Sequence, residues 1–375
     1  MIYKNFQNLG LSALGFGAMR LPVVDGDDAM IDEDAAAKMV AYAMEQGINY
    51  YDTAWGYHGG NSETVMGKIL SRYPRESFHL ASKFPGYDLS NMDKVESIFE
   101  EQLRKCRVEY FDFYLIHNVC EMNIEAYLDE KYGIMKYLLA QKERGRIRHL
   151  GFSVHGSLEV MERFLDAYGD HMEFGQIQLN YIDWAFQDAK AKVDALNGRR
   201  LPIWVMEPMR GGQLASLAPE FATRLKELRP AETVPAWAFR FLQTVPGVTV
   251  ILTGASNFEQ LRENIDIFMS DKPLAHGEMD ALLDIGAQMV GKIALPCTAC
   301  RYCISHCPQQ LDIPTLIGLY NEHSFTKNGF LAPMALKAFP EDKRPDACIA
   351  CGQCESVCPQ QIGISAAMAD FAEKV

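Results

Sequence analysis

The sequence lacks three features that would point to a membrane or nucleic-acid protein. No apolar run approaches the roughly 18 residues that a membrane-spanning helix needs. The amino terminus shows no basic patch followed by an apolar stretch, as a signal peptide would. Basic residues are in the minority, since 36 Lys and Arg stand against 49 Asp and Glu, for a net charge of −13. We therefore expect a cytoplasmic protein with no nucleic-acid partner and no membrane contact, because phosphate backbones select a basic excess.

Composition is otherwise that of an ordinary globular chain, except for the cysteines. Of the 375 residues, 48% are apolar and 23% charged, and the length suits two or three domains. Eight of the ten cysteines lie between Cys297 and Cys358. A disulfide scaffold would be short and secreted. Clustered cysteines in a long chain without an export signal therefore indicate bound metal.

Short apolar runs alternate with longer segments of helical spacing over the first 270 or so residues. The proposed strands are 14–17, 49–52, 78–83, 113–117, 149–153, 174–180, 202–207 and 248–252. Such alternation predicts a parallel sheet with crossover helices, and eight units suit a closed (β/α)8 TIM barrel of the α/β class. An open doubly wound sheet is the alternative, but no strand is followed by G-x-G-x-x-G. Composition changes near residue 290, so we expect a barrel over 1–290 and a ferredoxin-like iron–sulfur domain over 291–375.

The cysteine spacing C-x-x-C-x-x-C-x-x-x-C-P occurs twice in the second region. In two-cluster bacterial ferredoxins this run binds 4Fe–4S clusters, and the fourth cysteine of each run ligates the other cluster. Two ligand sets follow, namely Cys297, Cys300, Cys303 and Cys358 for one cluster, and Cys348, Cys351, Cys354 and Cys307 for the other. The alternative is structural zinc, which favours C-x-x-C pairs separated by a longer loop.

Polar residues stand at or near the ends of the proposed strands. In order they are Asp52, Lys83, His117, Ser153, Gln176, Gln178, Asn180, Glu207 and Gly254. In an eight-fold barrel, chemistry occurs at the carboxyl ends of the strands. One such residue alone would be a solvated strand end, whereas a convergent ring of Asp, Lys and His indicates a site, because buried charges persist only when paired.

Around the first of these positions the sequence resembles the aldo/keto reductase family. The segment 52–57 reads D-T-A-W-G-Y and is followed by N-S-E at 61–63, while Lys83 lies in A-S-K and His117 in L-I-H. The resemblance covers roughly residues 5–270, and the chain as a whole resembles the branch of the family that carries a two-cluster ferredoxin tail. It implies hydride transfer between a nicotinamide cofactor and a small carbonyl or alcohol substrate, with Asp52, Tyr57, Lys83 and His117 as catalytic residues.

The same resemblance implies a set of cofactor-binding residues on the later strands and their loops. They are Ser153, Gln176, Met206, Pro208, Gly211, Gly212, Gly254, Ala255, Ser256, Gln260 and Asn264. Met206 stands where the family commonly has an aromatic residue, and Gly254 and Gln260 stand where Lys and Arg often meet the 2′-phosphate. Either NADP(H) or NAD(H) is therefore expected. The glycine pair would let backbone N–H groups approach a pyrophosphate.

The chemistry of the catalytic set can also be argued from its residue types. Reduction of a carbonyl needs a proton at oxygen, and Tyr57 is a suitable acid, although the pKa of a free phenol is near 10. We expect the Lys83 ammonium to lower that pKa, and Asp52 to keep Lys83 charged and oriented. His117 would hold the carbonyl oxygen and relay a proton.

Three functions remain open for the two regions together. A hydride carries two electrons and each cluster carries one, so the two do not exchange without a flavin or a radical step. The first function is a nicotinamide-dependent reductase whose tail is structural or directed to a partner. The others are a ferredoxin-coupled, flavin-assisted redox enzyme with a one-electron partner, and a non-catalytic barrel that senses redox state. The complete catalytic set favours the first.

Overall fold

The computed structural model describes residues 1–327 and 329–375, which form two compact units, Met1–Leu282 and Leu283–Val375. The division falls inside helix α12 (His276–Gly291), a few residues before the boundary that composition suggests. Each unit is described separately below.

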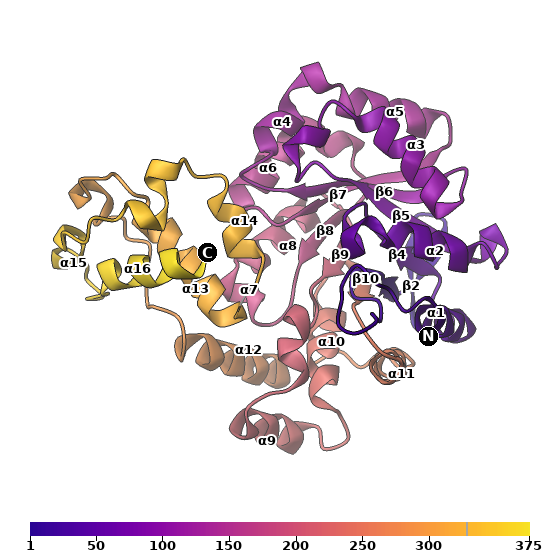
Figure 1. Ribbon diagram of the computed structural model, residues 1–375. Helices are drawn as coiled ribbons and strands as arrows, with labels where there is room; N and C mark the ends of the chain where they lie inside the picture. Colours follow the sequence, from indigo (N-terminus) through magenta and orange to yellow (C-terminus); the bar gives the residue numbers. More distant parts are fainter. Residues whose placement is uncertain (328) are drawn as a thin grey trace. The chain divides into compact units, whose positions relative to one another are not determined.

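Eight parallel strands of the first unit close into a barrel, in the order β10-β3-β4-β5-β6-β7-β8-β9 (Figure 1). The strands are β3 (Leu14–Gly17), β4 (Tyr50–Asp52), β5 (His79–Phe84), β6 (Phe111–Val119), β7 (Ile147–Val154), β8 (Gly175–Gln178), β9 (Ile203–Met206) and β10 (Val248–Thr253). Closure is made by β10, which pairs with β3 at Ile251 and Leu14. The predicted (β/α)8 fold is confirmed, and the open-sheet alternative is wrong.

Helices surround these strands in the order that the sequence pattern indicates (Figure 1). They are α1 (Glu33–Glu45), α2 (Ser62–Leu70), α3 (Val95–Cys106), α4 (Ile124–Leu128), α5 (Ile134–Glu143), α6 (Leu158–Tyr168), α7 (Asp183–Phe186), α8 (Ala189–Gly198), α9 (Pro219–Leu228), α10 (Val234–Thr244) and α11 (Phe258–Ile267). Several begin at a side chain that accepts a hydrogen bond from the first turn, as Asp32 does from the Ala35 N–H and Asn257 from the Gln260 N–H. The strands are apolar because helices cover the outer face of the barrel, and all nine residues of β6 are buried.

A hairpin of β1 (Tyr3–Phe6) and β2 (Leu9–Ser12) precedes the barrel and was not predicted. Its residue Phe6 is 2% exposed and meets the rings of Phe113 and Trp204 at centroid distances of 5.6 and 5.1 Å. Both partners lie near the amino ends of their strands. The hairpin therefore covers the end of the barrel opposite to the predicted site.

The second unit is built from short helices around its own small core. The helices are α13 (Ile313–Thr326), α14 (Leu331–Leu336), α15 (Gln353–Ser356) and α16 (Ile364–Lys374). Core residues include Leu311, Leu316 and Ile317 with Met368 and Phe371, together with two of the motif cysteines, Cys303 and Cys354. No helix within the described residues combines the length and apolar character needed to cross a membrane.

Candidate active site and cysteine cavities

Three predicted catalytic residues converge because adjacent strands end side by side. Asp52 is the last residue of β4, Lys83 lies one residue from the end of β5, and Tyr57 opens the short 3₁₀ helix Tyr57–Gly60 that follows β4. The Lys83 Nζ donates hydrogen bonds to Asp52 Oδ1 at 2.5 Å and to the Thr53 carbonyl oxygen at 2.8 Å. It lies 3.3 Å from the Tyr57 phenol oxygen. One ammonium thus connects the carboxylate and the phenol.

Burial and neighbouring charges act in opposite directions on the pKa values of Lys83 and Tyr57. Lys83 is fully buried, which favours the neutral amine, but the Asp52 carboxylate and the Tyr57 phenol outweigh this effect and raise the pKa of Lys83. For Tyr57, burial is the largest effect and raises the pKa above 10, while Lys83 acts to lower it. The expected effect of Lys83 is present, but the net pKa is higher than that of a free phenol, not lower. Tyr57 is therefore a neutral phenol with a proton to give.

His117 completes the predicted set from β6. Its ring meets that of Tyr57 edge to face, with centroids 6.0 Å apart, and that of Tyr87 at 5.2 Å. Burial and the nearby Lys83 charge hold the pKa of His117 well below its usual value of 6.5. A neutral imidazole carries one N–H, which can be donated to an oxygen placed beside Tyr57.

A buried network of polar side chains holds the backbone at Lys83 in place. The sequence analysis assigned no function to Gln102 or Ser82 in this network. Gln102 of α3 donates from Nε2 to the Lys83 carbonyl oxygen at 2.9 Å and to Glu63 Oε1 at 2.7 Å. The Ser82 hydroxyl donates to the same Glu63 oxygen at 2.6 Å. Glu63 belongs to the N-S-E segment, so the signature residues include groups that fix the backbone of β5 as well as groups at the site.

On the opposite side of the barrel mouth, three predicted cofactor residues lie on neighbouring strands. Ser153 and Gln176 are register partners on β7 and β8, and the Gln176 Nε2 lies 3.7 Å from the Met206 sulfur on β9. The Gln176 Oε1 is buried and makes no hydrogen bond within residues 1–327 and 329–375. A buried acceptor without a donor is costly. It fits a ligand that brings an amide N–H, such as the carboxamide of a nicotinamide.

The remaining predicted cofactor residues are of two kinds. Some lie in solvent-exposed turns, and the others are buried or form hydrogen bonds within the protein. Gly211 and Gly212 have φ of 66° and 94° and are exposed, as is Gly254 after β10. The side chains of Gln260 and Asn264 lie on α11 and instead form hydrogen bonds with the Ser256 N–H and the Thr253 hydroxyl. Their neighbour Ala255 and the more distant Pro208 are buried. Among these residues the glycines and Ser256 present an open surface for a ligand, and Gln260 is also exposed.

A cavity of about 580 Å³ lies beside Tyr57 and is open to solvent. It is lined by Ser256, by Gly56 to His58, and by residues of the loop after β3, including Arg20. The sequence analysis did not identify Arg20 as a residue of the site. In the structure the Arg20 side chain crosses to the later strands, where its Nη2 lies 3.5 Å from Glu207 Oε1.

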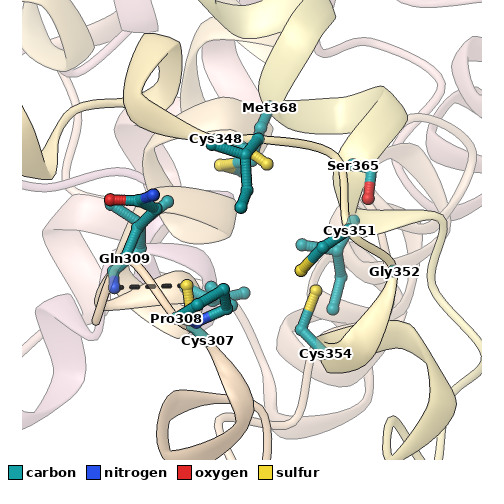
Figure 2. A pocket seen from close by; sticks show the side chains of 13 residues that line it. Cys307, Pro308, Gln309, Cys348, Cys351, Gly352, Cys354, Ser365 and Met368 are labelled. Carbon is teal, nitrogen blue, oxygen red and sulfur yellow. Dashed lines mark hydrogen bonds between the residues drawn. The ribbon is translucent and has the colours of Figure 1, made fainter.

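The motif cysteines of the second unit gather around two cavities. Cys297, Cys300, Cys303 and Cys358 line one, and Cys307, Cys348, Cys351 and Cys354 line the other. Figure 2 shows the second set, with Cys307 on one side of the cavity and Cys351 and Cys354 on the other. These are the two sets that the spacing predicts, each with its fourth cysteine taken from the other motif.

The thiols in each set are close enough to affect one another electrostatically. Burial raises the pKa of the Cys303 thiol, and charge on Cys297, Cys300 and Cys358 adds to the effect. Yet no three His, Cys, Asp or Glu side chains in the described part of the chain converge closely enough to hold a single metal ion. Four thiols around each cavity match the ligand number of one 4Fe–4S cluster.

Two family models match the chain, and they divide it as the structure does. The aldo/keto reductase family model matches residues 13–285, and a 4Fe-4S dicluster domain model matches residues 296–362. A probable aldo-keto reductase 1 from Glycine max is 31% identical over 155 residues, which cover 39% of this chain but only 42% of that protein. The NADH-specific methylglyoxal reductase of Escherichia coli is 24% identical over 304 residues, covering 69% of this chain and 90% of that protein.

Solved structures give the same result for the fold of the first unit. An aldo-keto reductase from Klebsiella pneumoniae in complex with NADPH superposes with a TM-score of 0.60 at 19% sequence identity, covering 76% of this chain and 95% of that one. At that identity the similarity shows the fold alone.

Proposed function

This chain belongs to the aldo/keto reductase family and carries a C-terminal 4Fe-4S dicluster domain, and from that premise we propose that it is an NAD(P)-dependent oxidoreductase of small carbonyl or alcohol substrates. The single observation that carries the proposal is the 3.3 Å separation of the Lys83 Nζ from the Tyr57 phenol oxygen, with Asp52 holding the ammonium. Idle side chains would not keep an ion pair fully buried beside a phenol, because burying the charges is costly.

Tyr57 is the proton donor in the direction of reduction. A bound nicotinamide supplies the hydride. Tyr57 gives its proton to the carbonyl oxygen, and Lys83 stabilises the phenolate that remains. Asp52 fixes the position of Lys83 and balances its charge. In alcohol oxidation the same groups take the proton back.

His117 orients the substrate oxygen. Its neutral imidazole lies edge-on to the Tyr57 ring, so an N–H from the ring and the Tyr57 hydroxyl can reach one oxygen atom together. Two donors at one oxygen polarise a carbonyl and favour the developing alkoxide over the ground state.

Ser153, Gln176 and the glycine turns are the residues that would hold the cofactor. The buried Gln176 Oε1 would accept from the nicotinamide carboxamide, and the exposed turn at 211–212 would face its pyrophosphate. The relatives differ in preference by name, one being NADH-specific and another containing NADPH. We expect the choice to depend on the loop after β10, which has no Lys or Arg at Gly254 or Gln260.

The two cysteine sets would each bind one 4Fe–4S cluster. Four thiolates per cavity match the ligand number of such a cluster, which supplies single electrons when bound. Cys300 and Cys351 are exposed, one in each set, so each cluster would lie near the surface of its unit. That exposure favours exchange of electrons with a one-electron partner as a second function. Cysteines that bind clusters and form no disulfides also suit a reducing compartment such as the cytoplasm.

The test of the barrel chemistry is Tyr57→Phe in the full chain, purified without oxygen. We expect turnover with methylglyoxal and NADPH or NADH to fall by about 10²- to 10⁴-fold. Nucleotide affinity, measured by fluorescence, should stay within about twofold. Retained turnover would contradict the role of Tyr57. Iron, sulfide and flavin analysis of the same sample separates the two functions, because released flavin would favour the ferredoxin-coupled enzyme.

A further inference from the structure

Arg20 lies in the barrel mouth without a firm partner. Its side chain is 43% exposed and lines the cavity that also holds Tyr57 and Ser256. Within the described residues its guanidinium makes one ion pair, with Glu207 at 3.5 Å. A guanidinium has five N–H donors in a fixed fork, which suits oxygen anions.

Two glycines bring the backbone of later loops against this side chain. A β-carbon on Gly211 would lie 3.4 Å from the Arg20 Nη2, and one on Gly254 would lie 3.3 Å from its Cδ. The Gly254 contact is closer than most contacts of a real β-carbon, so a larger residue there would displace the aliphatic part of the Arg20 side chain, whereas the Gly211 contact is near an ordinary van der Waals distance. Gly211 also has a φ of 66°, which disfavours other residues. Arg20 therefore joins the loops after β3, β9 and β10 at one point.

The backbone next to Arg20 is fixed, whereas its side chain is not. The Leu21 N–H donates to the buried His58 Nε2 at 3.0 Å, and the His58 Nδ1 bonds the Asp28 carbonyl oxygen at 2.7 Å. His58 follows Tyr57 directly. The base of the Arg20 side chain is thus held at a constant position relative to the phenol, and only its outer part is free to turn.

We propose that Arg20 is an anion-binding residue of the barrel mouth, which leaves Glu207 to pair with a phosphate or carboxylate group of the bound ligand. The inference rests on the proposed function and deepens it. A half-exposed pair at 3.5 Å contributes little to stability, so a bidentate oxygen anion displaces it. Glu207 competes with that anion for the guanidinium.

The anion can have two sources, the pyrophosphate of the nicotinamide cofactor or an acidic group on the substrate. Arg20 reaches the glycine turns after β9 and β10, which places it beside a pyrophosphate there. It also shares its cavity with Tyr57, which places it beside a carboxylate near the reacting carbonyl. Both sources present at least two negatively charged oxygens that can accept hydrogen bonds from one guanidinium.

The experiment compares Arg20→Met, Glu207→Gln and the control Arg144→Met, which removes an exposed arginine at the end of α5. NADH and NADPH affinities are measured by nucleotide fluorescence, and inorganic pyrophosphate binding by the shift in Tm. With saturating cofactor, KM is measured for pyruvate as an acidic carbonyl and for methylglyoxal as a neutral one.

We expect Arg20→Met to weaken anion binding by about 10- to 100-fold and Glu207→Gln to strengthen it, with no effect of the control. A loss for both nucleotides and pyrophosphate identifies the cofactor as the source, and a raised KM for pyruvate alone identifies the substrate. Unchanged affinities and KM values in Arg20→Met would overturn the proposal. A wild-type protein that binds pyrophosphate through Arg20 but no nicotinamide would refute the proposed function alone, and one that binds none of these anions would refute both.

Discussion

Replacing Lys83 with Met removes the charge that lies 3.3 Å from the Tyr57 oxygen. At this separation and an effective dielectric constant of about 20, the attraction between the ammonium and a phenolate is about 5 kcal/mol. That equals about 3 to 4 pKa units at Tyr57. Because the proton is only partly transferred in the transition state, we expect kcat to fall by about 10²- to 10⁴-fold.

The same substitution has a second effect that must be separated from the first. Asp52 is 2% exposed, and without Lys83 its carboxylate would be buried without a counter-charge. We expect the single variant to lose about 3–5 kcal/mol in the free energy of unfolding. The double variant Asp52→Asn, Lys83→Met removes both charges and should recover most of that stability, but not the turnover.

The assay is nicotinamide oxidation with methylglyoxal, beside urea unfolding of each variant. Loss of activity through misfolding would follow stability, so the double variant would regain turnover together with its free energy of unfolding. The electrostatic account requires the opposite, a stable and inactive double variant. Turnover within tenfold of wild type in either variant would refute the reasoning.

Three further predictions concern the pH dependence of the rate, the two cluster sites, and Glu173 at the end of the barrel opposite to the site. Because the pKa of Tyr57 is raised above 10 and that of His117 lies well below 6.5, the rate of reduction should be nearly flat between about pH 7 and 9, and a steep change in kcat there would count against these protonation states. Cys358→Ser should halve the iron content while the other cluster keeps its spectrum, whereas loss of both clusters would argue against two separate ligand sets. Burial acts to raise the pKa of Glu173, but hydrogen bonds from His149 and Lys142 lower it to about 2, so its contribution to stability is present above about pH 4.5 and is lost as pH falls toward 2. Glu173→Gln should therefore lower the free energy of unfolding at pH 7 more than at pH 3, and equal losses at both would contradict the lowered pKa of Glu173.

The barrel was predictable because its signal is local and repeated. Each strand is a short buried run followed by a segment of helical spacing, so eight such units define the order of the elements without any contact information. The hairpin β1–β2 was missed because it lacks such a repeated local signal. Its strands Y-K-N-F and L-G-L-S have four residues each and no clear alternation, and they form because Phe6 packs into the open end of the barrel. That packing is a tertiary contact between residues far apart in the sequence, so no local pattern indicates it.

The site was predictable where strand ends carry it and unpredictable where burial or distant pairing decides. Lys83 could be placed beside Tyr57 from the order of the strands. The net rise in the pKa of Tyr57 could not, because it depends on how completely the phenol is desolvated. Arg20 was missed because its neighbours Glu207 and Gly254 are far away in the sequence and only the closed barrel brings them together.

The barrel mouth therefore contains two ion pairs of the same chemical type but of opposite burial. Lys83 and Asp52 are almost fully buried at 2.5 Å, so opening this pair would leave a charge without solvent or partner, and the pair stays closed through the reaction. Arg20 and Glu207 are 43% and 17% exposed at 3.5 Å, so water can replace either partner at little cost. Lys83 must keep its place and its partner Asp52, because the Tyr57 phenolate is stabilised by its charge. Arg20 must be able to leave Glu207, because a strong ion pair with Glu207 would cancel the affinity of Arg20 for an anionic ligand.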